Sequence, residues 1–380
     1  MHFANISSSI DNSCQCMDLH AFLLVLFLSS ILLCHGGIEG DSDHWELSEK
    51  EDLELEKQLK FLNKPAIQTI QMKPTSLLRT SSRDQVSSKF AKPASITLKG
   101  GGCPVGTVPI RRITKEDLIR EKIASKIKSV EYSTLGDHFA VVRIRANSNK
   151  KFVGAGGKIS IHNPRVDGRS YSAARVSVRN GPDTIAAGWR VDPTLYGDTR
   201  TRLYIRLDAG KSHCFNTRCP GFVIVRSDIP LDQAYNTISV PGGQFFVLEA
   251  YIIKDQPNGN WWVELGPSRT QVGFWPKQIF SGLQDLATYI EWGGKTYSPS
   301  GTTPPQMGSG MFAVKNNLGN GDAYISQVSV LNEFRQIVDP DNAEEFADNN
   351  WLYNVRDEGN KGGNVQRLVL YGGPGGKRRV

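Results

Sequence analysis

The first apolar pattern along the chain is helical. Leucines recur three and four residues apart over residues 48–62, and Asn63-Lys64-Pro65 ends the pattern. These positions are Leu55, Leu59 and Leu62. Ser48 precedes Glu51 by three residues, which is the spacing of a capping box. The sequence therefore predicts an amphipathic helix that begins at Ser48 and has an acidic outer face.

A second helix is expected after Thr114, which can cap it. Its apolar face would contain Leu118, Ile119, Ile123 and Ile127. Residues 66–100, between the two helices, are rich in Ser, Lys, Thr and Pro and have no sustained period, as in a loose connection. The helical pattern gives way to alternation between Lys128 and His138, and we place the boundary at residues 130 and 131.

From His138 onward the pattern is that of short strands. Runs rich in β-branched and aromatic residues alternate with Gly- and Pro-containing turns. Examples are 139–145, 158–162, 202–206, 222–225, 245–253, 261–265 and 323–331. We predict an all-β fold over residues 131–380, an antiparallel β-sandwich preceded by a small, mainly helical segment.

A leader is predicted before these elements. Residues Ala21 to Cys34 form a nearly unbroken apolar run followed by Gly36 and Gly37, as in a signal peptide covering residues 1–37. A start at Met17 would give a more ordinary leader. The run is short for a membrane span, although a membrane anchor is the alternative. With the leader removed we expect no stable membrane span and a secreted, extracellular protein.

Three cysteines remain once Cys14, Cys16 and Cys34 leave with the leader. In an oxidising compartment Cys214 and Cys219 can close a tight loop as a disulfide. A zinc site is the alternative, but only His213 lies nearby as a further ligand, so no metal is expected. Cys103 would then be unpaired.

Charge and motifs exclude several functions. The net charge of +7 is modest for 380 residues, and no segment interleaves basic and aromatic residues as a nucleic-acid groove does. The chain has no nucleophile elbow, zinc-protease motif or phosphate loop. The three histidines of the β region, His138, His162 and His213, have no recognisable catalytic setting, and no cofactor is expected.

Carboxylates are the remaining candidates for chemistry. Glu291 lies between Ile290 and Trp292 at the end of an apolar run, where burial would raise its pKa as a general acid requires. The alternative is an edge-strand glutamate that faces water.

Several long segments resemble the neprosin family of plant secreted proteins. They are 52–65, 100–112, 187–193, 195–203, 214–222, 273–276, 290–294 and 306–310, in family order. The resemblance implies a secreted zymogen, with an activation peptide over residues 38–130 that acts as an intramolecular inhibitor. It also implies a β-sandwich that cleaves after proline with two glutamates.

The resemblance assigns Glu291 as the second catalytic glutamate. The first belongs two residues before Gly188-Trp189, where this chain has Ala186. An alanine cannot transfer a proton, so we expect little peptidase activity unless another acid reaches the site. The nearest candidates are Asp183, Asp192 and Glu264. The activation peptide could be cut at Arg111-Arg112 or nearer Lys128.

Three functions therefore stay open. The first is an altered glutamic, prolyl-endopeptidase-like enzyme. The second is a catalytically silent protein that binds peptide or proline-rich wall protein, in the apoplast or cell wall. Its cleft candidates are Trp189, Tyr196, Trp275 and Trp292. The third is a carbohydrate-binding β-sandwich, since paired carboxylates and tryptophan platforms also suit glycans.

Overall fold

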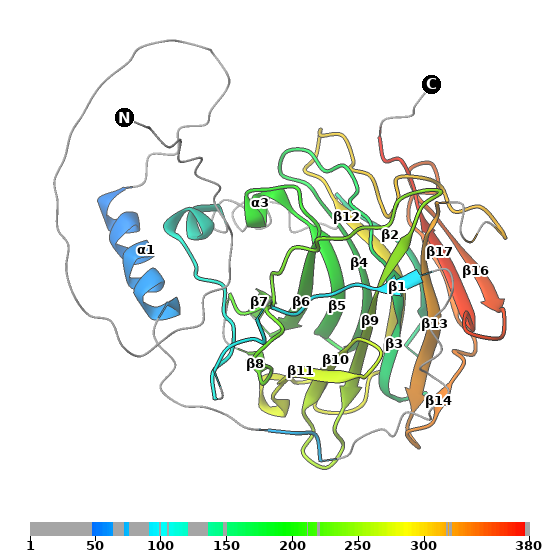
Figure 1. Ribbon diagram of the computed structural model, residues 1–380, viewed down its shortest axis with the longest axis horizontal. Helices are drawn as coiled ribbons and strands as arrows, with labels where there is room; N and C mark the ends of the chain where they lie inside the picture. Colours follow the sequence, from blue (N-terminus) through cyan, green and yellow to red (C-terminus); the bar gives the residue numbers. More distant parts are fainter. Residues whose placement is uncertain are drawn as a thin grey trace, which may run out of the picture.

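The computed structural model describes most of the chain after residue 47 (Figure 1). The described residues are 48–63, 72–75, 91–98, 100–104, 106–120, 136–146, 150–210, 212–218, 221–316, 318 and 321–376. The predicted leader lies outside them. Among the described residues, no helix is long and apolar enough to cross a membrane.

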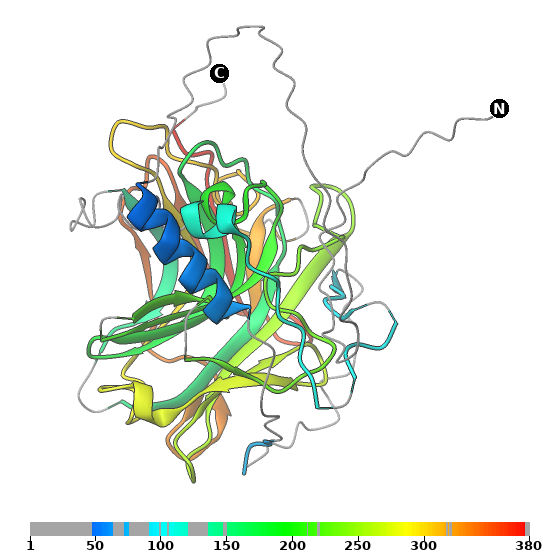
Figure 2. The ribbon, with the colours of Figure 1, turned by 90° about the vertical axis from the view of Figure 1, so that its left-hand side faces the viewer.

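The predicted first helix is confirmed as α1 (Glu49–Leu62). The Ser48 hydroxyl accepts from the Glu51 N–H at 3.3 Å, and the Glu51 carboxylate accepts from the Ser48 N–H at 3.2 Å, which completes the capping box. Residues 115–120 are also helical, as expected after Thr114, and residues 121–130 lie outside the described part. Leu55, Ile113 and Leu118 share a small apolar cluster, and Figures 1 and 2 show the two helices side by side outside the sheets.

The rest is a β-sandwich, which confirms the predicted fold class. The first sheet has ten strands among the described residues, with β16-β17-β13-β3-β9-β10-β11-β8 as its main order. These strands are β1 (Ala91–Pro93), β3 (Phe152–Ser160), β8 (Val223–Ile224), β9 (Phe245–Lys254), β10 (Trp261–Leu265), β11 (Thr270–Trp275), β13 (Ala323–Asn332), β14 (Ile337–Val338), β16 (Asn354–Asn360) and β17 (Arg367–Gly372). The short strand β1 pairs with β9 in parallel, whereas every other pairing described is antiparallel.

The second sheet has seven described strands in the order β15-β2-β12-β4-β5-β6-β7. They are β2 (Asp137–Ile144), β4 (Tyr171–Asn180), β5 (Asp183–Val191), β6 (Arg202–Ala209), β7 (Ser212–Phe215), β12 (Tyr289–Tyr297) and β15 (Glu344–Ala347). Two short helices connect strands, α3 (Pro193–Tyr196) and η2 (Lys277–Ile279).

Side-chain alternation gives the seven-stranded sheet two different faces. On β5, Ile185, Ala187 and Trp189 belong to the core between the sheets. Ala186 and Arg190 alternate with them and point to the opposite face. On that face the sheet carries the charged side chains described next, and we call it the polar face.

Candidate functional site

The strand register brings the two family glutamate positions into one row of the polar face. Glu291 on β12 pairs with Ser177 on β4, and Ser177 pairs with Ala186 on β5. Ala186 in turn pairs with Arg206 on β6. The sequence-predicted positions 291 and 186 therefore lie in register, with one strand between them.

Glu291 is held by two neighbours from its own face. Its Oε1 accepts from Nε of Arg175 at 3.2 Å and also from Nη2 of the same guanidinium. Its Oε2 accepts from the Tyr289 hydroxyl at 2.8 Å. Glu291 and Arg175 are both buried, at 6% and 7% exposure. The carboxylate is thus fixed in position and accepts hydrogen bonds through both oxygens.

The protonation of Glu291 differs from the expectation for a general acid. Burial raises its pKa, as expected, but Arg175, Tyr289 and Lys295 outweigh burial and hold the pKa below its ordinary value. Arg175 likewise stays charged: burial lowers its pKa, and the Glu291 carboxylate raises it above the usual range. Glu291 is therefore a carboxylate near neutral pH, and the prediction of a raised pKa is wrong.

None of the three replacement acids reaches Ala186. Asp183 accepts from the backbone N–H groups of Ser281, Gly282 and Leu283 at 2.7, 2.6 and 3.0 Å, so it orders that loop. Asp192 pairs with Arg190 and caps α3 through the Leu195 N–H at 3.0 Å. Glu264 lies on β10, in the other sheet.

The prediction that tryptophan side chains line a cleft is wrong. Trp189, Trp275 and Trp292 are at most 1% exposed and belong to the core between the sheets. The indole N–H of Trp189 donates to the Ser160 carbonyl, and that of Trp292 donates to the Gly156 carbonyl, at 2.8 and 3.1 Å. Both side chains therefore lie on the face opposite Glu291 and Ala186. Their burial also removes the tryptophan platforms that favoured carbohydrate binding.

Tyr196 is buried away from that row, on α3. Its ring lies under the Arg202 guanidinium, with 5.0 Å between the guanidinium carbon and the ring centroid, and its hydroxyl is 3.4 Å from the Asn216 amide nitrogen. The structure places it in a packing role at the end of β5.

Sequence reasoning missed the basic side chains of the polar face. Each has a carboxylate partner: Arg175 with Glu291, Arg190 with Asp192, Arg206 with Asp208, and Lys295 with Asp137. Side chains an even number of residues apart in a strand lie on the same face. Arg175, Arg190 and Arg206 each have this spacing from another polar-face residue of their own strand, and this spacing was the signal in the sequence. The pKa of Lys295 is lowered to about 8, because burial together with the charges of Arg206 and Arg175 outweighs the opposing effect of Asp137.

The cysteines differ from one expectation. Cys103 and Cys214 are both disulfide-bonded, so the prediction that Cys103 is unpaired is wrong. Cys219 lies outside the described residues, and its pairing with Cys214 stays a prediction. Among the described residues no group of three or more His, Cys, Asp or Glu side chains could hold a metal ion.

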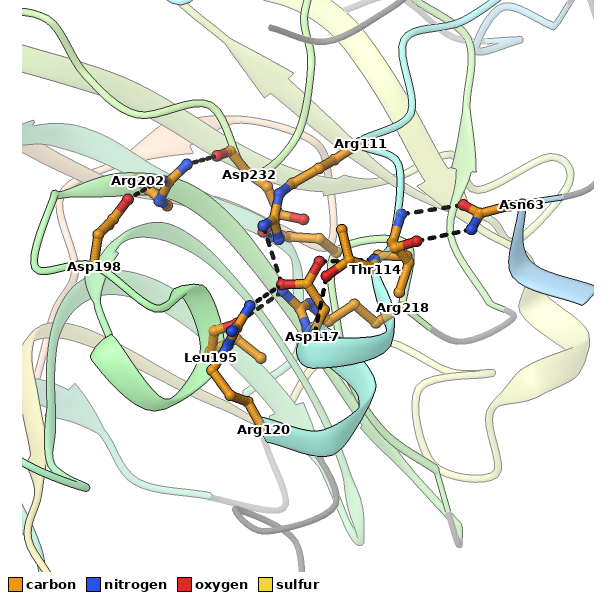
Figure 3. Close-up of polar contacts among 12 residues, drawn as sticks. Asn63, Arg111, Thr114, Asp117, Arg120, Leu195, Asp198, Arg202, Arg218 and Asp232 are labelled. Atoms are coloured by element: carbon orange, nitrogen blue, oxygen red, sulfur yellow. Dashed lines mark hydrogen bonds and ion pairs between the residues drawn. The ribbon is translucent and has the colours of Figure 1, made fainter. Parts of the chain in front are cut away.

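Residues 106–120 contact the β-sandwich through a charged cluster at Asp117 (Figure 3). The fully buried Asp117 accepts from Arg111 at 3.1 Å, from Arg120, and from the Thr114 N–H at 3.0 Å. Burial raises its pKa, but the Thr114 N–H and the guanidinium groups of Arg111, Arg218 and Arg120 lower it by more. Arg218 belongs to the sandwich and donates to the Leu195 carbonyl at 3.1 Å, so its charge beside Asp117 places this segment against the end of β5.

Asn63 connects α1 to the same segment. Its side chain donates to the Ile113 carbonyl at 2.8 Å and accepts from the Ile113 N–H at 3.1 Å. Further toward the sandwich, the Cys103 N–H donates to the Ser227 carbonyl at 2.7 Å. The residues before the sandwich are therefore tied to it at several places.

Solved structures and one family model are similar to this chain. A crystal structure of scytalido-glutamic peptidase with a peptide-based transition-state analogue is similar at 9% identity and a TM-score of 0.34, over 63% of this chain and 97% of that one. SCP-B, of the eqolisin family of peptidases, in a complex with the tripeptide Ala-Ile-His, is similar at 10% identity and a TM-score of 0.33, again over 63% and 97%. The neprosin family model matches residues 168–374, more than half of the chain and a range that includes Ala186 and Glu291. The chain belongs to the neprosin family.

Proposed function

We propose that this chain is a peptidase-like protein that binds peptide over the polar face and hydrolyses it slowly or not at all. The observation that carries the proposal is the row Glu291–Ser177–Ala186, in which the first position of the family's glutamate pair has only a methyl group. Membership of the neprosin family supports the peptidase-like site.

The chemistry of amide hydrolysis explains the expected loss. One group must take a proton from water, and another must donate a proton to the leaving amine. Glu291 is an ionised carboxylate held by Arg175 and Tyr289, so it can accept a proton. With no acid at position 186, the loss of one partner lowers the rate by about two to four orders of magnitude.

Secretion and a zymogen form are part of the proposal. The apolar run 21–34 supports a leader, and disulfide bonds at Cys103 and Cys214 support an oxidising, extracellular location. The charge of Arg218 beside Asp117 and the hydrogen bond from the Cys103 N–H to the Ser227 carbonyl support an inhibitory segment that packs against the sandwich. We expect the ligand to be a proline-containing peptide or a proline-rich protein.

Titration calorimetry of the secreted protein with a proline-rich peptide tests this function. The same samples are analysed by mass spectrometry after incubation at pH values from about 3 to 7, with and without prior acid treatment. We expect binding without detectable cleavage. Rapid cleavage after proline, abolished in Glu291→Gln, would show a working peptidase instead, and no binding under any condition would refute the peptide site.

A further inference from the structure

The place of the missing glutamate is flanked by two arginines. Arg206 is the direct cross-strand neighbour of Ala186, and side chains at such positions start about 5 Å apart. Arg175 is the diagonal neighbour, since it pairs with Gly188 two residues further along β5. The side chain at position 186 is a methyl group, and the one at position 188 is a hydrogen atom. No β5 side chain therefore separates the two guanidinium groups there.

Both arginines keep a donor group that the described residues do not use. Arg175 binds Glu291 through Nε and Nη2, and Arg206 binds Asp208 through the same two atoms at 2.5 and 3.0 Å. Neither Nη1 group makes a hydrogen bond within the described part of the chain. A guanidinium can bind a second carboxylate through its remaining edge, so each arginine can accept another anion.

The carboxylates already present lie to either side of Ala186. Glu291 is two strands away on one side, and Asp208 lies two residues along β6 on the other. Lys295 is close enough to be influenced by both Arg175 and Arg206, and Asp137 compensates its charge at 2.7 Å. Ala186 and Arg175 are buried, at 1% and 7% exposure, and solvent reaches this part of the face from β6, where the side chains of Arg206 and Asp208 are 18% and 19% exposed.

The geometry points to a carboxylate-binding subsite above Ala186, formed by Arg175 and Arg206, which selects peptides with an acidic group. This inference rests on the proposed peptide-binding function and specifies its ligand. A peptide carboxylate would stand in for the glutamate that the family resemblance assigns to position 186, so the ligand would supply the charge that this chain lacks there.

Fluorescence anisotropy with three labelled peptides tests the subsite in the whole secreted protein. The peptides share one proline-containing sequence and differ at one group: an internal Glu with an amidated C-terminus, Gln at that position with the amide, and Gln with a free C-terminus. We expect the Glu peptide to bind about tenfold or more tightly than its amidated Gln counterpart. A preference for the free C-terminus instead would identify the chain terminus as the source of the carboxylate.

One variant and its control assign the preference to this subsite. Arg206→Gln removes one of the two guanidinium groups, so the preference for the Glu peptide should disappear. Arg226→Gln is the matched control, because Arg226 binds Asp228 through Nε and Nη2 in the same way, outside the polar face, and it should keep the preference.

Equal affinity of the wild type for all three peptides would overturn the subsite and leave the proposed function intact. Failure to bind any peptide would overturn both. Unfolding curves of each variant separate loss of the preference from loss of the fold.

Discussion

Arg175 depends on Glu291 for its charge compensation. Both side chains are under 10% exposed, and removal of one partner leaves a buried charge unpaired. We expect Glu291→Gln to lower the free energy of unfolding by about 3 kcal/mol, measured by urea denaturation. Asp228→Asn is the control, because its partner Arg226 is 42% exposed and can be solvated, and it should change stability much less. Equal effects of the two substitutions would contradict the account of this pair.

The same pair predicts a pH dependence. The pKa of Glu291 in the folded protein lies below its ordinary value of 4.5, so its stabilising contribution is complete above about pH 4.5 and is lost as the pH falls through the folded-state pKa. The difference in unfolding free energy between wild type and Glu291→Gln should be constant from about pH 5 to 7 and shrink below that range. A difference that grew on acidification would indicate a raised pKa.

The sequence predicted most of the helices and strands, but it did not predict which residues of other strands contact Glu291. The capping box at Ser48 and the period-two runs are local patterns, and they predicted α1 and the strands. The contact between Arg175 and Glu291 joins β4 and β12, strands more than a hundred residues apart, so it depends on a register that no local pattern fixes.

The spacing of residues in the sequence already indicated that the tryptophan prediction was wrong. Trp189 is three residues from Ala186, and Trp292 is adjacent to Glu291. An odd separation within one strand places two side chains on opposite faces, so a strand assignment already excludes both residues from the face of the glutamate pair.

We expect the attachment of residues 106–120 to the sandwich to depend on Asp117. Asp117→Ala removes the acceptor that orders this segment and the negative charge that faces Arg218 of the sandwich, so the segment should detach more often from the sandwich. We expect trypsin to cleave after Arg111 or Arg112 about tenfold faster or more than in wild type. Glu116→Ala, at the neighbouring exposed position, should leave the rate close to wild type; an equal acceleration would mean that Asp117 does not anchor this segment.

For the whole molecule, the disulfides are the feature that the sequence predicted least well. Cysteine spacing suggested a local loop at Cys214 and left Cys103 over, whereas both are bonded in the folded chain. We expect iodoacetamide to label neither residue in the native full-length chain and to label both after reduction and unfolding, as read by peptide mass spectrometry. Labelling of Cys103 without reduction would contradict this.

We expect position 186 to limit catalysis in an otherwise retained site. The direct measurement is the rate of cleavage of a proline-containing peptide by Ala186→Glu, with Ala186→Gln as the neutral control of similar size. The account predicts that the glutamate variant gains cleavage by about two orders of magnitude or more over wild type, that the gain is lost when Glu291→Gln is added, and that Ala186→Gln shows none. Wild-type cleavage as fast as that of Ala186→Glu would contradict it.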